Sequence, residues 1–291
     1  MAEQTYGVVV VSWNVQAELR RCLTALGRER RAGSTFEVVV VDNNSKDDSV
    51  DTVRREFPWV RLFAQEKNLG FAQACAIGAA ATTANLLVFL NPDTEVGEGF
   101  FSKLGSFFAS HPRAGVVGGS ITGEGGVQQP SVRGLPTFWP LLLDELKLLQ
   151  RFPGLVRRYL CVGFDYGASQ PVEQVMGACF AVPRPAWEAL GGFDVSFFMW
   201  FEEVDFCARA RSAGYEVWYE AALRLSHVRG ASARQLSYFQ RHYLYTQSLV
   251  RYAAKHHGKV ASSVLTWCSI PGFIAASLAD YVRTATRAKC S

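Results

Sequence analysis

The sequence predicts an α/β protein with a Rossmann-like, mostly parallel central sheet flanked by helices, followed by a C-terminal helical extension. Residues 8–11 and 36–41 are valine-rich apolar runs, as strands buried on both faces of a parallel sheet require. Between them, Leu19, Leu23 and Leu26 recur at helical spacing, and charged residues occupy the opposite face. Strand, helix and strand form one βαβ unit, from which parallel sheets are built.

The alternation of strands and helices continues along the chain. A glycine-rich turn at residues 123–126 precedes a segment at 138–159 that is rich in leucine and aromatic residues, and we expect an irregular helical insertion there. The main domain is expected to cover residues 1–235, with this insertion at about 137–165, and the helical extension residues 236–291. The other predicted elements are helices near 48–57, 71–83 and 185–190, and strands near 60–63, 86–90, 115–119, 172–182 and 216–218.

Composition limits the classes to which the protein can belong. Its 291 residues are 49% hydrophobic and 19% charged, which indicates a globular protein and excludes a mainly disordered one. A net charge of +4 is too small to indicate nucleic-acid binding. Seven cysteines without a Cys-x-x-Cys pair indicate reduced thiols, and the N-terminus lacks a signal-peptide pattern. We therefore expect a cytoplasmic protein that binds no nucleic acid.

Polar clusters follow three of the predicted strands, at residues 12–14 (Ser-Trp-Asn), 42–45 (Asp-Asn-Asn-Ser) and 91–93 (Asn-Pro-Asp). Ligands of such sheets bind beyond the carboxyl ends of the strands, and a nucleotide is the expected ligand. No Gly-x-Gly-x-x-Gly turn and no P-loop follows the first strand, which argues against dinucleotide and P-loop sites. In the alternative interpretation, Asp42 and Ser45 only cap the next helix.

Asp93 follows the apolar run at residues 86–90, and the ring of Pro92 restricts the backbone before it. A carboxylate in this place is suited to a divalent cation that neutralises charge on a leaving diphosphate. The alternative is a plain Asn-Pro-Asp turn. His227 follows the predicted strand at 216–218, where a single histidine most often has a structural role.

Acidic and aromatic residues are interleaved at 198–211, where Glu202, Glu203 and Asp205 adjoin four aromatic residues. An acid beside apolar bulk is typical of a general base with a perturbed pKa. If this segment is helical, Asp205 and Arg209 form an i, i+4 pair and the two glutamates lie in the first turn. The alternative is an ordinary acidic helix start.

Taken together, these stretches resemble glycosyltransferase family 2, and in particular its bacterial rhamnosyltransferase-like branch. The resemblance covers about residues 8–232 and implies the GT-A fold, a nucleotide-sugar donor and a divalent metal. The matching stretches are, in order, Val-Val-Ser-Trp-Asn (10–14), Val-Asp-Asn-Asn-Ser (41–45), Asn-Leu-Gly-Phe-Ala (68–72), Asn-Pro-Asp (91–93), Gly-Gly-Phe-Asp (191–194) and Phe-Glu-Glu-Val-Asp-Phe-Cys (201–207).

The resemblance also implies roles for individual residues. Asp93 and His227 would bind Mg²⁺ or Mn²⁺ at the diphosphate, and Glu203 matches the catalytic base, with Glu202 and Asp205 beside it. The sequence departs from the family here, because the family has Asp where this chain has Glu203. The longer side chain displaces the carboxylate by roughly 1 Å unless the backbone adjusts. The expected donor-binding residues are Ser12, Trp13, Asn14, Asp42, Asn44, Asn68, Gly70, Phe71, Asn91, Asp93 and Gly177.

The implied reaction is a single displacement that inverts the anomeric configuration. Glu203 deprotonates an acceptor hydroxyl, which attacks the anomeric carbon from the face opposite the diphosphate. The branch favours dTDP-rhamnose as donor and a cell-surface polysaccharide or polyprenyl-linked glycan as acceptor, with UDP-linked galactofuranosyl or hexosyl donors as the alternative. Two further classes stay open: a nucleotidyltransferase, although its glycine-rich basic loop is absent, and a non-catalytic nucleotide-sugar-binding subunit.

The C-terminal extension is apolar but poorly suited to crossing a membrane. Residues 260–282 carry Asp280 as their only charge and are interrupted by Pro271. Trp267 and basic flanks favour peripheral docking at the inner face of the cytoplasmic membrane. The alternatives are packing on the core or on a homodimer partner, and a true span. Segment 138–159 is either a second surface for a lipid-linked acceptor or a helix that closes the acceptor side.

Overall fold

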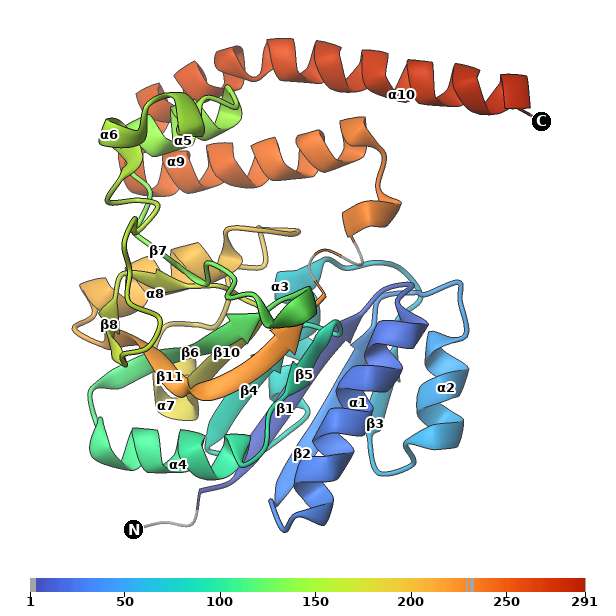
Figure 1. Ribbon diagram of the computed structural model, residues 1–291, viewed down its shortest axis with the longest axis vertical. Coiled ribbons are helices and arrows are strands. Elements are labelled where there is room, and N and C mark those ends of the chain that lie inside the picture. Colours follow the sequence, from blue (N-terminus) through green and yellow to red (C-terminus); the bar gives the residue numbers. More distant parts are fainter. Residues whose placement is uncertain (1–3, 229, 231–232, 291) are drawn as a thin grey trace.

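The computed structural model describes residues 4–228, 230 and 233–290, and a nine-stranded sheet with helices on both faces forms its centre (Figure 1). The strand order is β3-β2-β1-β4-β10-β6-β11-β5, and β8 pairs with β11 beside this path. Strands β3, β2, β1 and β4 are parallel, and β10 is antiparallel to β4. The main-sheet strands are β1 (Tyr6–Ser12), β2 (Phe36–Asp42), β3 (Arg61–Ala64), β4 (Leu86–Leu90), β5 (Thr94–Val96), β6 (Ala114–Thr122), β8 (Gln170–Val172), β10 (Cys179–Pro183) and β11 (Glu216–His227).

Helices cover both faces of this sheet, and a second, two-stranded sheet lies beside it. The second sheet pairs β7 (Val132–Arg133) with β9 (Gln174–Val175). The helices are α1 (Gln16–Arg31), α2 (Ser49–Glu56), α3 (Phe71–Ala80), α4 (Phe100–Ser110), α5 (Phe138–Glu145), α6 (Pro153–Val156), α7 (Arg184–Ala189), α8 (Glu202–Ser212), α9 (Tyr238–Cys268) and α10 (Ile270–Cys290), with 3-10 turns η1 (Glu124–Gly126), η2 (Leu149–Arg151) and η3 (Ala233–Gln235).

The central strand β1 shows why this sequence forms a doubly covered sheet. Successive side chains of a strand point to opposite faces. Val8 and Val10 belong to the apolar cluster that contains the leucines of α1, whereas Val9 belongs to the cluster on the other face, with residues of α3. Gly78 of α3 lets the helix approach closely, because a Cβ there would lie 2.3 Å from Val9. The valine run is therefore buried on both sides, as predicted.

Two predicted strands differ from the structure. Residues 172–182 do not form one strand, because the chain changes partners twice there: β8 pairs with β11, β9 with β7, and β10 with β4 and β6. The strand predicted at 216–218 is longer and runs to His227 as β11, which continues past an irregularity between Glu220 and Arg224. The insertion at 138–159 is helical and irregular, as expected, and consists of α5, η2 and α6.

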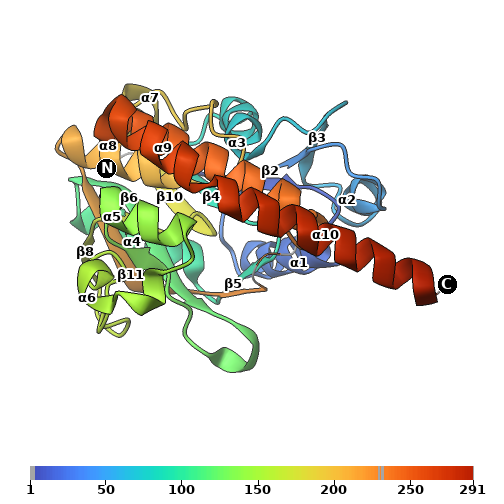
Figure 2. The same ribbon diagram turned by 90° about the horizontal axis from the view of Figure 1, so that it is seen from above.

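The C-terminal helices form a hairpin above the sheet. Gly258 adopts φ 88° and ψ 171°, which divides α9 into a first arm, residues 238–257, and a second arm that continues into α10. The carboxylate of Asp280 accepts hydrogen bonds from the amides of Tyr238 (3.0 Å) and Phe239 (2.9 Å), so α10 closes the start of α9. Seen from above, α10 crosses the body and its end projects beyond α1 (Figure 2).

One helical stretch of the described residues, Tyr238–Arg283, is long and apolar enough to cross a membrane by length and composition. The chain reverses direction at Gly258 within this stretch, so the stretch consists of two antiparallel arms and is not one straight helix.

Candidate active site

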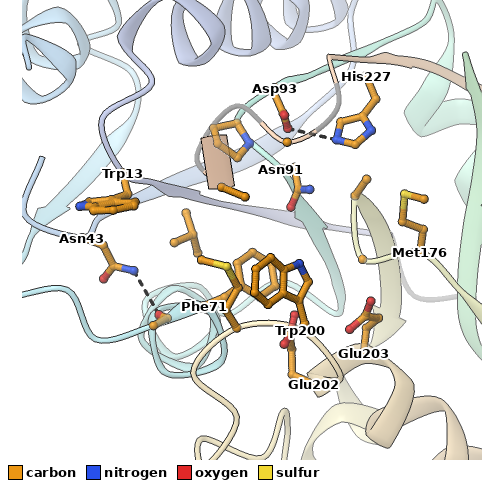
Figure 3. Close-up of a pocket in the computed structure, with 18 of the residues that line it drawn as sticks. Trp13, Asn43, Phe71, Asn91, Asp93, Met176, Trp200, Glu202, Glu203 and His227 are labelled. Carbon is orange, nitrogen blue, oxygen red and sulfur yellow. Dashed lines mark hydrogen bonds and ion pairs between the residues drawn. The ribbon is translucent and has the colours of Figure 1, made fainter. Parts of the chain in front are cut away.

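A cavity of about 400 Å³, called here the first cavity, opens at the carboxyl ends of β1, β2 and β4 (Figure 3). This is the place where open α/β sheets bind their ligands. Residues from both halves of the chain meet in it. Its lining is Val11, Trp13, Asn43, Asn68, Gly70, Phe71, Asn91, Pro92, Asp93, Met176, Gly177, Ala178, Met199, Trp200, Glu202, Glu203, His227, Gly230 and Ala233.

One wall of the first cavity is built from the loops after β1, β2 and β3. The buried Asn43 donates from Nδ2 to the carbonyl of Gly70 (3.1 Å), which ties the β2 loop to the start of α3. Gly70 has φ 82°, and a Cβ there would lie 2.5 Å from the carbonyl oxygen of Phe198. The amide of Phe71 donates to the same oxygen (2.7 Å). Glycine at 70 therefore lets the loop before α8 pack against this wall.

Asp93 and His227 form a buried pair at another wall, with Oδ1 and Nε2 3.2 Å apart (Figure 3). They are distant in sequence, and antiparallel pairing of β5 with the end of β11 brings them together. The amide of Val228 also donates to the carbonyl of Asp93 (2.9 Å). Arg229, Ala231 and Ser232, which complete the stretch singled out after His227, lie outside the described residues.

Gln129 sets the orientation of the His227 ring. Its Oε1 lies 3.2 Å from His227 Nδ1, and its Nε2 donates to the His227 carbonyl (2.9 Å). With the Nδ1 proton directed at Gln129, Nε2 keeps a lone pair that faces the cavity, as in metal sites where a second residue orients the ligating histidine. Gly123 leaves space for this side chain, since a Cβ there would lie 2.7 Å from Gln129 Nε2.

The Asp93–His227 pair fits a divalent cation as a two-ligand site. The described residues contain no group of three or more His, Cys, Asp or Glu side chains arranged to hold a metal. A carboxylate and an imidazole suit Mn²⁺, and Mg²⁺ is also commonly bound through few side chains together with substrate phosphates and water. Any cation held here would therefore depend on the donor diphosphate for part of its coordination.

Glu202 and Glu203 begin α8 at the opposite side of the cavity from the Asp93–His227 pair (Figure 3). In each, Oε2 is buried and has no hydrogen-bond partner among the residues that the structure describes. Burial raises the pKa of Glu202 well above its usual range, and the charge of Glu203 raises it further. Burial also raises the pKa of Glu203, against hydrogen bonds from nearby backbone amides. A carboxylate tuned in this direction is suited to general-base chemistry near neutral pH.

The two residues before α8 have a strained backbone. Trp200 and Phe201 have φ values of 66° and 67°, which residues other than glycine rarely adopt. The first arm of the C-terminal hairpin holds this conformation: Ser248 Oγ donates to the Met199 carbonyl (2.8 Å), and the Phe201 ring packs 5.5 Å from that of Tyr252. The hairpin therefore supports the loop that delivers Glu203.

Several predicted site residues do not line the first cavity. Asp42 accepts hydrogen bonds from the amide (2.8 Å) and hydroxyl (2.5 Å) of Ser45, which closes a turn; it does not cap α2. Asp205 points into the protein, where Arg209 (2.7 Å), Lys255 (2.8 Å) and His256 (2.9 Å) surround it. Its position favours a structural role over the predicted catalytic one. The predicted residues outside the lining are Ser12, Asn14, Asp42, Asn44 and Asp205.

The other predicted residues lie together at the first cavity, namely Trp13, Asn68, Gly70, Phe71, Asn91, Asp93, Gly177, Glu202, Glu203 and His227. Sequence reasoning missed Asn43 and Gln129. Asn43 stands beside Asp42 in the same motif, and only the side-chain direction distinguishes the two. Gln129 follows a glycine-rich turn and carries no local pattern that indicates contact with His227.

Comparisons with known proteins identify the family and the fold of the chain. Residues 7–161 match the family model for glycosyl transferase family 2. The chain is 27% identical over 248 residues, 77% of its length and 76% of the relative's, to an N-acetylglucosaminyl-diphospho-decaprenol L-rhamnosyltransferase of Mycobacterium tuberculosis. It is 23% identical over 208 residues, 70% of its length and 61% of the relative's, to a low-salt glycan biosynthesis hexosyltransferase of Haloferax volcanii.

Two solved structures share the fold. A mannosyltransferase of Pyrobaculum calidifontis in complex with GDP-Man and Mn²⁺ matches with a TM-score of 0.57 and 18% identity, over 99% of this chain and 80% of that one. GalNAc-T7 with UDP, GalNAc and Mn²⁺ matches with a TM-score of 0.60 and 19% identity, over 79% of this chain and 44% of that one. The predicted GT-A fold is confirmed, and the chain belongs to glycosyl transferase family 2, as a rhamnosyltransferase-like member.

Proposed function

We propose that this glycosyltransferase is an inverting, metal-dependent enzyme with Glu203 as its base. The observation that carries the proposal is the placement of the buried Asp93–His227 pair and of Glu203 on different sides of one cavity. The first would face the donor diphosphate and the second the acceptor hydroxyl. Single displacement by an acceptor hydroxyl requires a base on the acceptor side, which Glu203 would supply.

The residues of the first cavity divide the work as follows. Trp13 offers an aromatic face to the nucleobase, and Asn43 and Asn68 offer polar groups. Asp93 and His227 would hold Mg²⁺ or Mn²⁺, which neutralises negative charge on the leaving diphosphate. Glu203 takes the proton of the acceptor hydroxyl as that oxygen attacks the anomeric carbon. Because burial raises its pKa, transfer is expected to slow as pH falls through that pKa.

The proposed donor is dTDP-L-rhamnose, and the proposed acceptor is a glycan linked to a polyprenyl diphosphate. The mycobacterial relative, matched over about three quarters of both chains, is named for an L-rhamnosyl transfer to such a lipid. UDP-sugars are the second candidate donors, supported by a structural neighbour that contains UDP. Mn²⁺ in two neighbours supports the proposed metal.

Ligand-dependent stabilisation tests the donor proposal. The full chain would be melted with dTDP-rhamnose, dTDP-glucose, UDP-galactofuranose, UDP-glucose or GDP-mannose, each with and without Mn²⁺. A specific ligand raises the Tm by mass action, so dTDP-rhamnose with Mn²⁺ should give the largest shift. NMR of the product from a synthetic acceptor would then report the anomeric configuration. Donor binding without hydrolysis or transfer would instead indicate a non-catalytic binding subunit.

A peripheral membrane contact is also proposed, through the second arm of the hairpin. Val260, Trp267 and Leu278 lie on one helical stripe and are 80%, 73% and 60% exposed. Asp280 is the only acidic residue of the arm, and its carboxylate is engaged by the amides of Tyr238 and Phe239. An apolar stripe free of other negative charge is suited to the surface of an anionic bilayer, with the enzyme on the cytoplasmic side.

Flotation with vesicles tests this contact. The full chain should float with vesicles that contain phosphatidylglycerol and less with pure phosphatidylcholine. The double variant Trp267→Ser/Leu278→Ser should lose flotation, whereas the buried-side control Leu265→Val should keep it. Equal flotation of all three proteins would exclude the stripe as the contact. A dimer that dissociates only in the double variant would assign the stripe to a homodimer interface.

A further inference from the structure

A second cavity, of about 300 Å³, adjoins the first and shares Met176, Trp200 and Glu203 with it. The shared carboxylate of Glu203 therefore faces two spaces, of which the first is assigned above to the donor. At this volume, the second cavity is at the small end of ligand sites and matches about one sugar unit. Its lining also includes Arg133, Tyr159, Gln174 and Tyr245. The chain thus has a built compartment next to its proposed base.

Arg133 supplies positive charge to the second cavity, and no acidic partner for it is found in the described part of the chain. Among the described residues its guanidinium has one hydrogen bond, from Nη1 to the carbonyl of Val132 (3.0 Å), and it forms no ion pair. The neighbouring acid Glu173 is already engaged by the amide of Leu135 (2.6 Å) and by Arg158. The guanidinium has five N–H donors, so most of its fork stays available for a ligand.

The backbone that carries Arg133 is held in place. Arg133 pairs with Gln174 in the two-stranded β7–β9 sheet, and Gln174 Nε2 donates to the carbonyl of Gly134 (2.8 Å). β9 leads directly into Met176 and Gly177, which contact the space around Glu203. Arg133 and Glu203 are therefore set relative to each other by one short, hydrogen-bonded ribbon. A charged group at such a position can fix an acceptor without a large loss of side-chain entropy.

The remaining walls are aromatic and suited to a sugar ring. Tyr159, Trp200 and Tyr245 line the second cavity, and the rings of Trp200 and Tyr245 meet edge to face at 5.7 Å. Asp144 accepts the hydroxyl hydrogen bond of Tyr245, which fixes that ring. Sugar rings present C–H groups that pack against aromatic faces, whereas a phosphate requires a cation. Both kinds of surface are present in one compartment.

We infer that the second cavity binds the acceptor as a sugar that carries a phosphate-type anion, with Arg133 as the specificity-determining residue for that anion. The inference rests on the proposed function, because it takes Glu203 as the acceptor-side base. The sugar lies against Trp200 and Tyr245 with a hydroxyl at Glu203, and the anionic group lies at Arg133. A planar guanidinium matches phosphate oxygens through two parallel hydrogen bonds, which a lysine cannot reproduce.

Acceptor competition tests the assignment with the full chain. The measured quantity is the ratio of kcat/KM for a short-chain N-acetylglucosaminyl diphosphate lipid to kcat/KM for octyl N-acetylglucosaminide. Wild-type protein should prefer the diphosphate. Arg133→Gln should lower this ratio by about ten- to a hundredfold, since hydrogen bonds between charged groups contribute about 1.5–3 kcal/mol. Arg133→Lys should lower it by less, and Arg157→Gln, an exposed arginine outside both cavities, should leave it unchanged.

The outcomes separate this inference from the proposed function. Transfer with an equal ratio for wild type and Arg133→Gln overturns the inference and leaves the proposed function standing. If wild-type protein prefers an octyl glucuronide to the diphosphate, the anion recognised is a carboxylate and not a phosphate, and the inference is also overturned. If wild-type protein shows neither donor-induced stabilisation nor any transfer, the proposed function itself is contradicted. Unfolding of a variant would lower kcat/KM for both acceptors equally and leave their ratio unchanged. Tm measurements on each variant confirm that it is folded under the assay conditions.

Discussion

The two cavities that meet at Glu203 are built in different ways. The donor side of the first cavity consists of loops that directly follow β1, β2 and β4, so short sequence motifs describe it. The second cavity is assembled from β7, β9, the start of α8 with the loop before it, the insertion and the first arm of the C-terminal hairpin. If the proposed assignments hold, donor recognition depends mainly on the sheet that defines the fold, whereas acceptor recognition depends largely on segments added around it. Changes to the second set can alter the acceptor while the donor site is kept.

The largest expected effect is on the residue shared by both cavities. Glu203→Gln removes the proposed base and keeps the shape of the side chain, so kcat should fall by about 10²–10⁴-fold. Donor affinity, measured by titration calorimetry with dTDP-rhamnose and Mn²⁺, should stay close to wild type. Glu188→Gln, at an exposed position on α7, is the matched control. A wild-type rate in Glu203→Gln would refute the assignment of the base.

The next effect concerns the support of Glu203 by the C-terminal hairpin. Tyr252 is 2% exposed and packs on Phe201, so Tyr252→Ala should lower the free energy of unfolding by about 3–5 kcal/mol. Denaturation by urea measures this change. Well below the Tm, the variant should also show a lower kcat, because the strained loop before α8 loses its packing. Tyr281→Ala, at a residue that is 74% exposed, should change neither quantity.

A smaller effect is expected for the orientation of His227. Gln129→Leu removes the partner of Nδ1 and keeps the size of the side chain, so Mn²⁺ affinity should fall by about ten- to a hundredfold. Electron paramagnetic resonance of free Mn²⁺, in the presence of dTDP, reports this affinity independently of turnover. Gln247→Leu, on the exposed side of α9, provides the comparison. Identical Mn²⁺ binding in both variants would show that Gln129 has no role at the metal.

The smallest effect is a gain in stability. Burial raises the folded-state pKa of Glu202 above its unfolded value, so the native state binds this proton more tightly than the unfolded chain. The resulting stability is present below the unfolded pKa and is lost as pH rises through the folded pKa. At pH 8, the free energy of unfolding of Glu202→Gln should therefore exceed that of wild type by about 1–2 kcal/mol. The difference should disappear at about pH 4. A pH-independent difference would contradict the buried charge as its cause.

Strands β1, β2 and β4 of the parallel half of the sheet could be predicted because each contains a local apolar run, which is a property of neighbouring residues. The strand expected at 172–182 could not, because β8, β9 and β10 take three different partners that are distant in sequence. The proposed site shows the same division. Trp13, Asn68 and Asp93 were expected at the cavity and lie there, whereas Asp205 is turned inward by Lys255 and His256.

The sequence by itself determined the family, the fold and the motifs that come together at the first cavity, because any parallel sheet brings the carboxyl ends of its strands to one edge. Only the tertiary structure decided which side chain of a motif faces the cavity, as for Asn43 over Asp42, and which distant residues meet it, as for Gln129 at His227. It also decided that Arg133 and Glu203 border one compartment. The physical reason is that side-chain direction and long-range pairing depend on packing between elements, which local sequence patterns do not encode.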